Sequence, residues 1–95
     1  MIETEIWYYV KSQTRIVRLT RKASLSAAPF IGSEIDVKHD HLTISRVIFN
    51  DGGGIVAIAG DDHGQTDRAW DDAELPALLK EMEDIGWEVS SNVPR

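Results

Sequence analysis

The sequence predicts an α+β domain in which a small antiparallel sheet carries one C-terminal helix. Three observations support this fold class: short runs of β-forming residues, turn residues between them, and one amphipathic stretch near the C-terminus. The chain has 95 residues, enough to bury one hydrophobic core and too few for two. Residues 1–95 are therefore expected to form a single domain.

The helix is expected at about residues 72–85. Its apolar residues repeat at helical spacing and form one face: Leu75, Leu78, Leu79, Met82 and Ile85. Asp71 or Asp72 is the expected N-cap, because a carboxylate can accept hydrogen bonds from the first free N–H groups. Pro76 then lies near the first turn, where the loss of its N–H does least harm.

Gly86 is expected to end this helix as the left-handed residue of a Schellman turn. Such a turn would fold Trp87 back toward Met82, leaving Glu83 in solvent. A short edge strand is expected at 87–89, and residues 90–95 are expected to form a frayed tail.

Five strands are expected from the β-branched and aromatic runs. They span about residues 5–10, 15–21, 34–38, 41–50 and 55–59. Polar residues at 11–14 suit the loop of a first hairpin, His39-Asp40 closes the next pair, and the glycine-rich run 50–54 turns the chain into the last strand. Residues 22–33 lose this periodicity and are expected to form the longest loop.

The strand at 41–50 contains a slip in its apolar pattern. Leu42 and Ile44 alternate in one register, whereas Val47 and Phe49 alternate in the other. All four can reach the core only if the strand is bulged or bent near Ser45-Arg46. Strong bending closes small sheets, so the sequence favours a partly open five-stranded β-barrel of the SH3-like or OB-like kind, or a curled sheet with the helix across one face.

Composition excludes several classes of site. The chain has no cysteine, which rules out disulfides, thiolate metal sites and a cysteine nucleophile. Glu3 and Glu5 stand where a signal peptide would carry basic residues, and no apolar run approaches the length of a membrane span. A cytoplasmic protein that does not associate with membranes is expected.

The net charge of −6 is unevenly distributed. Residues 71–95 hold seven acidic and two basic residues, whereas residues 1–70 hold nine acidic and eight basic residues. Five of the basic residues fall in the first hairpin: Lys11, Arg15, Arg18, Arg21 and Lys22. The overall charge disfavours duplex nucleic acid, whose binding depends on a dense basic surface.

The aromatic run Trp7-Tyr8-Tyr9 yields the candidate binding residues. Strand alternation places Trp7 and Tyr9 on one face and Tyr8 on the other. If Tyr8 faces the core, Trp7 and Tyr9 point outward beside Arg18 and Lys22. Aromatic rings beside cations suit the stacking of a nucleotide base near its phosphate, and they suit a protein interface equally well. The alternative is that the helix or the long loop covers this face as a second core.

Metal binding and catalysis are weakly indicated. Imidazoles and carboxylates of the kinds that bind divalent metals occur at His39, His41, Asp61, Asp62 and His63. They fall in predicted turns, however, where these residues are common for backbone reasons. The glycines at 52–54 precede a strand rather than a helix, which excludes a P-loop. We therefore expect no bound metal, no cofactor and no catalytic residue.

These observations favour a noncatalytic protein-binding module, such as an inhibitor or adaptor, that is a monomer or a homodimer. Its short, acidic, cysteine-free composition is also typical of inhibitors encoded by viruses and mobile elements. The second interpretation is a binder of a small phosphorylated ligand such as a nucleotide, through Trp7, Tyr9, Arg18 and Lys22. The third is a metal-dependent enzyme whose metal is bound by His39, His41, Asp61 and His63.

Overall fold

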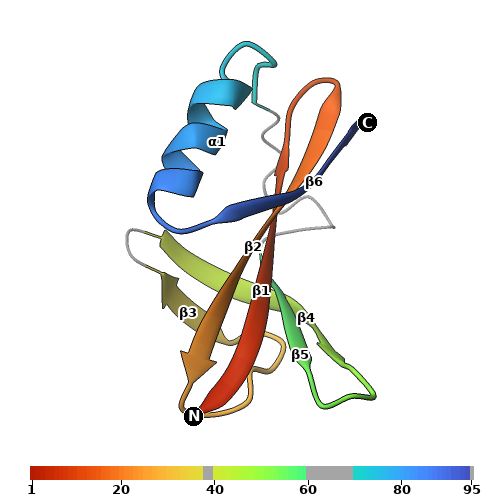
Figure 1. Cartoon of the computed structure of the whole chain (residues 1–95), viewed down its shortest axis with the longest axis vertical. Coiled ribbons are helices and arrows are strands. Elements are labelled where there is room, and N and C mark those ends of the chain that lie inside the picture. The colour runs from red at the N-terminus through yellow and green to blue at the C-terminus, as the bar shows by residue number, and fades with distance from the viewer. Residues whose placement is uncertain (38–39, 60–69, 95) are drawn as a thin grey trace.

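A computed structural model of the chain describes residues 1–37, 40–59 and 70–94 (Figure 1). In chain order its elements are β1 (Ile2–Lys11), β2 (Arg15–Leu25), β3 (Glu34–Val37), β4 (Asp40–Phe49), β5 (Ile55–Ala59), α1 (Leu75–Asp84) and β6 (Glu88–Pro94). The predicted class, an α+β domain with a sheet and a C-terminal helix, is confirmed. Within the described ranges no helix combines the length and the apolarity that crossing a membrane requires.

The sheet has six described strands in the order β3-β4-β5-β1-β2-β6. It is mixed, because β1 and β5 run parallel while every other neighbouring pair is antiparallel. The sheet stays open, with β3 and β6 at opposite edges. The expected five-stranded antiparallel barrel is therefore not formed by the described residues. The reason lies in β5, an unbroken apolar run that is buried on both faces and so takes a central place between β1 and β4.

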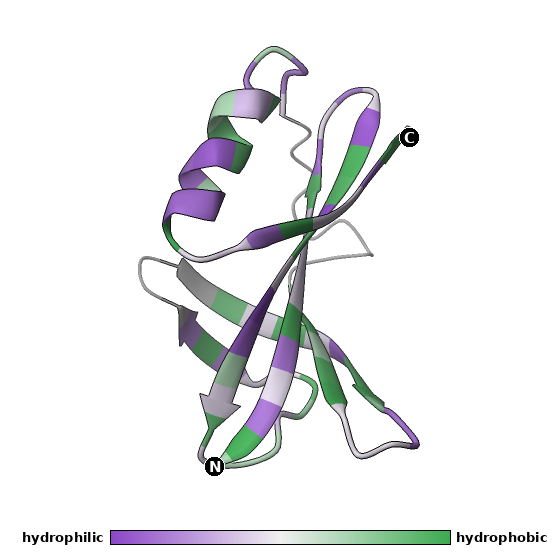
Figure 2. Ribbon diagram, in the orientation of Figure 1, coloured by the Kyte–Doolittle hydropathy of each residue, from purple (hydrophilic) through white to green (hydrophobic). Residues whose placement is uncertain are grey.

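The predicted first hairpin is confirmed, with longer strands than expected. Tyr8 lies opposite Leu19, and Tyr9 lies opposite Arg18. One face of the hairpin joins the main core, into which Ile6, Val10, Val17 and Leu19 are buried. Figure 2 shows α1 with its hydrophobic side toward the strands and its hydrophilic side away from them.

The bulge predicted in the fourth strand is also confirmed. Ile44 pairs with Ala59 and Arg46 with Ile58, so one extra residue, Ser45, is inserted between them. The Ser45 hydroxyl donates a hydrogen bond to the carbonyl oxygen of Ile58 at 3.1 Å. Because of this insertion, Ile44 and Val47 on the two sides of the bulge both pack in the core, whereas Phe49 is 67% exposed and does not reach it.

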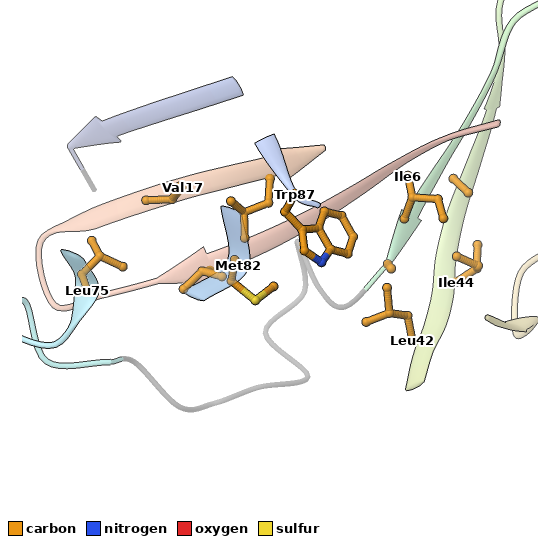
Figure 3. Close-up of a cluster of buried hydrophobic side chains, with 11 residues drawn as sticks. Ile6, Val17, Leu42, Ile44, Leu75, Met82 and Trp87 are labelled. Carbon is orange, nitrogen blue, oxygen red and sulfur yellow. The ribbon is translucent and has the colours of Figure 1, made fainter. Parts of the chain in front are cut away.

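The C-terminal end of α1 forms the predicted Schellman turn. Gly86 has φ 105°, its N–H donates to the carbonyl oxygen of Glu83 at 3.1 Å, and the Trp87 N–H donates to that of Met82 at 3.0 Å. Trp87 is thereby folded back and is 3% exposed. Figure 3 shows its indole between Met82 of α1 and the strand residue Ile6.

The N-terminal end of α1 differs from the prediction. The helix begins at Leu75, its N-cap is Glu74, and no side chain caps it, so neither Asp71 nor Asp72 has the expected role. Instead Asp72 accepts hydrogen bonds from the N–H and the hydroxyl of Thr14, at 3.2 and 3.0 Å. These contacts fasten the turn of the first hairpin to the segment before the helix.

The expected frayed tail at 90–95 is wrong, because residues up to Pro94 belong to strand β6. β6 pairs antiparallel with β2 and ends the sheet on that side. Two arginines of β2 hold it: Arg15 donates from Nη2 to the carbonyl oxygen of Asn92 at 3.0 Å, and Arg18 contacts Ser90. These partners lie more than 70 positions apart in the chain, so no local pattern indicated them.

Candidate functional site

The four candidate residues Trp7, Tyr9, Arg18 and Lys22 lie on one face of the first hairpin. In the β1–β2 register Tyr9 is opposite Arg18. Trp7 lies two positions from Tyr9 on β1, and Lys22 lies four positions from Arg18 on β2, so both are on the same face. We call this surface the outer face, because α1 packs against the opposite one. At its centre the Arg18 guanidinium carbon lies 4.3 Å from the centroid of the Trp7 ring, a cation–π contact.

Two further residues fix this stacked pair. Trp7 donates from Nε1 to the Glu5 carboxylate at 3.1 Å. Arg18 donates from Nε to the hydroxyl of Ser90 at 2.9 Å, and that hydroxyl contacts the Arg18 carbonyl oxygen at 3.2 Å. Both side chains of the pair are therefore held by hydrogen bonds as well as by the stack. Sequence reasoning missed both supports, although the position of Glu5, two residues before Trp7 on one strand, placed it on the same face.

The outer face is partly packed and partly presented to solvent. Trp7, Tyr9 and Arg18 are half-buried, and Lys22 is exposed. On the same face of the neighbouring strand β5, Val56 and Ile58 are 5% and 3% exposed and lie outside the main core cluster. The alternative of a second core thus describes the β5 side of this face, whereas the β2 side offers polar and charged groups.

Lys22 lies apart from the stacked pair, in acidic surroundings. It is opposite Glu5 in the register, and it lines a hollow of about 340 Å³ together with Glu3, Glu5 and Asn50. Glu3 in turn accepts a hydrogen bond from the Ser24 hydroxyl at 2.6 Å. Because two carboxylates share this hollow with one ammonium group, it is poorly suited to an anionic ligand.

A second cavity, of about 370 Å³, lies between α1 and the sheet. Its lining is mainly apolar and consists of Tyr8, Val10, Trp70, Leu78, Glu81, Met82 and Ile85. Among the described residues that line it, the one carboxylate is that of Glu81, and none is Lys, Arg or Ser. Nearby, the buried Trp87 Nε1 has no hydrogen-bond partner in the part of the chain that the structure describes.

The proposed metal ligands cannot be assembled from the described residues. His39, Asp61 and His63 lie outside them, and His41 belongs to β4. Among the residues that are described, no group of three His, Asp or Glu side chains is placed to hold a metal ion. The metal-dependent interpretation therefore remains a prediction about segments beyond the described ranges.

Comparison with known proteins gives no functional assignment, since no family model, curated protein or solved structure matches this chain. The function is therefore argued from the geometry of the outer face and from the charges around it.

Proposed function

We propose that this chain is a noncatalytic protein-binding module of the cytoplasm, and that a protein partner binds at Trp7, Tyr9, Arg18 and Lys22. The observation that carries the proposal is the Trp7–Arg18 stack, in which Trp7 is also hydrogen-bonded to Glu5 and Arg18 to Ser90. Trp, Tyr and Arg are the residues most enriched among those that dominate binding energy at protein interfaces. A pair that is already ordered loses little side-chain entropy when a partner binds.

Charge favours a protein over a small phosphorylated ligand. A phosphate needs an excess of donors, yet the outer face carries Glu3 and Glu5 within reach of Lys22. The Nε donor of Arg18 is already used by Ser90. A mixed surface of aromatic, cationic and anionic groups matches the centre and rim of a protein interface better than a phosphate site. The phosphorylated ligand is kept as the second candidate because the Trp7–Arg18 stack also suits a nucleotide base.

Site-specific photo-cross-linking in the cells that express the protein tests the proposal. A benzophenone side chain in place of Tyr9 is expected to give one discrete protein adduct. The same group in place of Glu83, an exposed residue of α1, serves as the control and should give none. The adduct at position 9 should be lost when Arg18→Ala is added. Equal adducts from both positions, or an adduct that survives Arg18→Ala, would contradict the proposal.

Thermal unfolding with and without nucleotides tests the second candidate. A ligand at about 100 times its Kd stabilises the native state by about 2.7 kcal/mol, which is easily measured. We expect no change in the unfolding midpoint with millimolar ATP or GTP. A clear rise that disappears in Arg18→Ala would replace the protein-binding proposal with the nucleotide one.

A further inference from the structure

The turn between β4 and β5 contains the single Asp-Gly step of the chain, Asp51-Gly52. Figure 1 shows this turn at the end of the molecule opposite α1. Asp51 and the three glycines that follow it are all exposed. An aspartate followed by glycine can react with its own backbone, because glycine has no side chain to shield its peptide nitrogen from the neighbouring carboxyl group.

The backbone hydrogen bonds of the turn leave both reacting groups unengaged. The Gly53 N–H donates to the carbonyl oxygen of Asn50 at 2.9 Å, and the Asn50 N–H donates to that of Gly54 at 2.8 Å. With Gly53 at φ 93°, this is a three-residue hairpin loop closed by a left-handed glycine. Within the described residues the Gly52 N–H donates no backbone hydrogen bond, and the Asp51 carboxylate accepts none. Neither group has to break a contact with a described residue before it reacts.

The turn also has the room that ring closure requires. A Cβ built on Gly52 or on Gly53 would meet no atom within 4 Å. Closure requires rotation of the backbone between Asp51 and Gly52, and two successive glycines allow that rotation at low steric cost. The carboxyl group of Asp51 can therefore approach the Gly52 nitrogen while the strands on either side stay paired.

The end of α1 provides a contrasting aspartate. Asp84 is followed by Ile85, whose β-branched side chain crowds its own backbone nitrogen. The Ile85 N–H also donates to the carbonyl oxygens of Glu81 and Met82, at 3.3 and 3.2 Å. The same reaction is therefore hindered at Asp84 by both the side chain and the hydrogen bonds.

We propose that Asp51 is a modification site, at which the folded protein isomerises aspartate to isoaspartate through a succinimide. The Gly52 nitrogen attacks Cγ of the protonated Asp51 carboxyl group. The N–Cγ bond forms, the bond from Cγ to the hydroxyl breaks, and the hydroxyl leaves with the amide proton as water. Water then opens the ring. Attack at Cγ restores aspartate, whereas attack at the backbone carbonyl carbon leaves the chain running through Cβ and Cγ. One water leaves and one returns, so no other reactant is needed.

The product changes the turn and the surface beside it. Isoaspartate adds one carbon to the backbone of a three-residue loop, so the hydrogen bond from Gly53 to Asn50 is lost. Asn50 and Gly54 also line the hollow that contains Lys22, and the isomerisation therefore alters one wall of that hollow. The inference does not depend on the proposed function, because it concerns a covalent change within the chain itself.

Peptide mapping of the folded protein, incubated at neutral pH and physiological temperature, tests the proposal. We expect isoaspartate to accumulate at Asp51, together with a transient form that is lighter by one water. Electron-transfer fragmentation locates both. In water enriched in heavy oxygen, the aspartate and the isoaspartate that arise from the ring should both carry the label. Asp84 in the same sample should show neither isoaspartate nor label in its side chain beyond the background of an unincubated sample.

Gly52→Ala is the matched variant, because its methyl group has open space and the φ of Gly52 is not positive. It should isomerise several-fold more slowly and keep the native urea midpoint. Gly86→Val, expected to lower stability far from the turn, should isomerise at the native rate, since the turn reacts without unfolding. An absence of isoaspartate at Asp51, or an equal rate in Gly52→Ala, would overturn the proposal. Acceleration in Gly86→Val that matches its loss of stability would also overturn it, because the reaction would then belong to the unfolded chain.

Discussion

Two tryptophan–arginine pairs lie on opposite faces of β1 and β2, and they differ in what surrounds them. On the helix side the Arg21 guanidinium carbon is 5.4 Å from the Trp87 ring centroid, and Trp87 is 3% exposed. On the outer face Arg18 is 4.3 Å from the centroid of Trp7, which is half-buried. Arg21 also donates a hydrogen bond to the carbonyl oxygen of Ile85 at the end of α1, at 3.2 Å. We call Trp87 and Arg21 the inner pair and Trp7 and Arg18 the outer pair; the inner pair connects the end of the helix to the sheet.

The comparison shows the same kind of contact in two different surroundings. In the inner pair Trp87 belongs to the core cluster, and Arg21 donates a hydrogen bond to the carbonyl oxygen of Ile85, the C-cap of α1. The outer pair contacts a surface carboxylate and a strand-edge hydroxyl. We infer that loss of the inner pair costs stability and that loss of the outer pair costs binding.

The largest effect is expected from Trp87→Ala. Truncating a large buried aromatic residue typically costs about 3–5 kcal/mol, and Trp87 lies between Met82 and the strand residues of the core. Urea unfolding measures it. Trp87→Phe is the matched control: it should cost much less, because it keeps most of the ring and removes an N–H whose unpaired burial costs about 1–3 kcal/mol. Similar losses in both variants would mean that ring volume does not set the stability of this face.

Gly86→Val should have the next largest effect. A β-branched side chain is strained at φ 105°. Its Cβ would also lie 3.3 Å from Nη2 of Arg21, the arginine that stacks on Trp87. The left-handed conformation alone costs about 1–2 kcal/mol. Glu83→Gln, an exposed change on the same helix, should stay within a few tenths of a kcal/mol. Equal urea midpoints for the two variants would show that the helix end does not depend on the left-handed residue.

The smallest effect is expected at the other end of α1, far from both pairs. Hydrogen bonding with the Ser12 hydroxyl, and then with Thr14, holds the pKa of Asp72 below its ordinary value of 3.8. Because the pKa of Asp72 is lower in the folded state, the ionised carboxylate stabilises the folded protein at pH values above the pKa of the unfolded state. This stabilisation is lost as the pH falls through the folded-state pKa. The difference in thermal midpoint between native protein and Asp72→Asn should thus be present at pH 7 and shrink below pH 3.8. A difference that grows on acidification would contradict this.

Local patterns in the sequence predicted what local physics decides. Gly86 ended the helix where expected, since only glycine adopts its φ without strain, and the slip between Ile44 and Val47 located the bulge. The short edge strand expected at 87–89 is the start of β6, but its continuation to Pro94 and the parallel pairing of β1 with β5 were missed, because they depend on partners distant in the chain. The unbroken apolar run of β5 was the available sign of a central strand.

The shared face of the candidate residues was predictable from strand alternation, a local property. Alternation puts Trp7 and Tyr9 on one face, and Arg18 is the cross-strand partner of Tyr9 on that same face. Their supports were not predictable. Ser90 contacts Arg18 only because residues 88–94 pair with β2. Asp72 accepts a hydrogen bond from Thr14 instead of capping the helix, because the hairpin turn lies beside it. A carboxylate or hydroxyl can choose among many donors, so its partner follows from the fold rather than from spacing.

The most direct test of the account is the free energy of unfolding of Trp7→Ala in urea, compared with that of Trp87→Ala and read beside the cross-linking yield at position 9. The account predicts that Trp7→Ala costs about 1 kcal/mol, the scale of an exposed cation–π contact and partial burial, and abolishes the cross-link. If Trp7→Ala instead destabilises the protein as much as Trp87→Ala, or leaves the cross-link intact, the outer pair is a second core contact and the binding proposal is wrong.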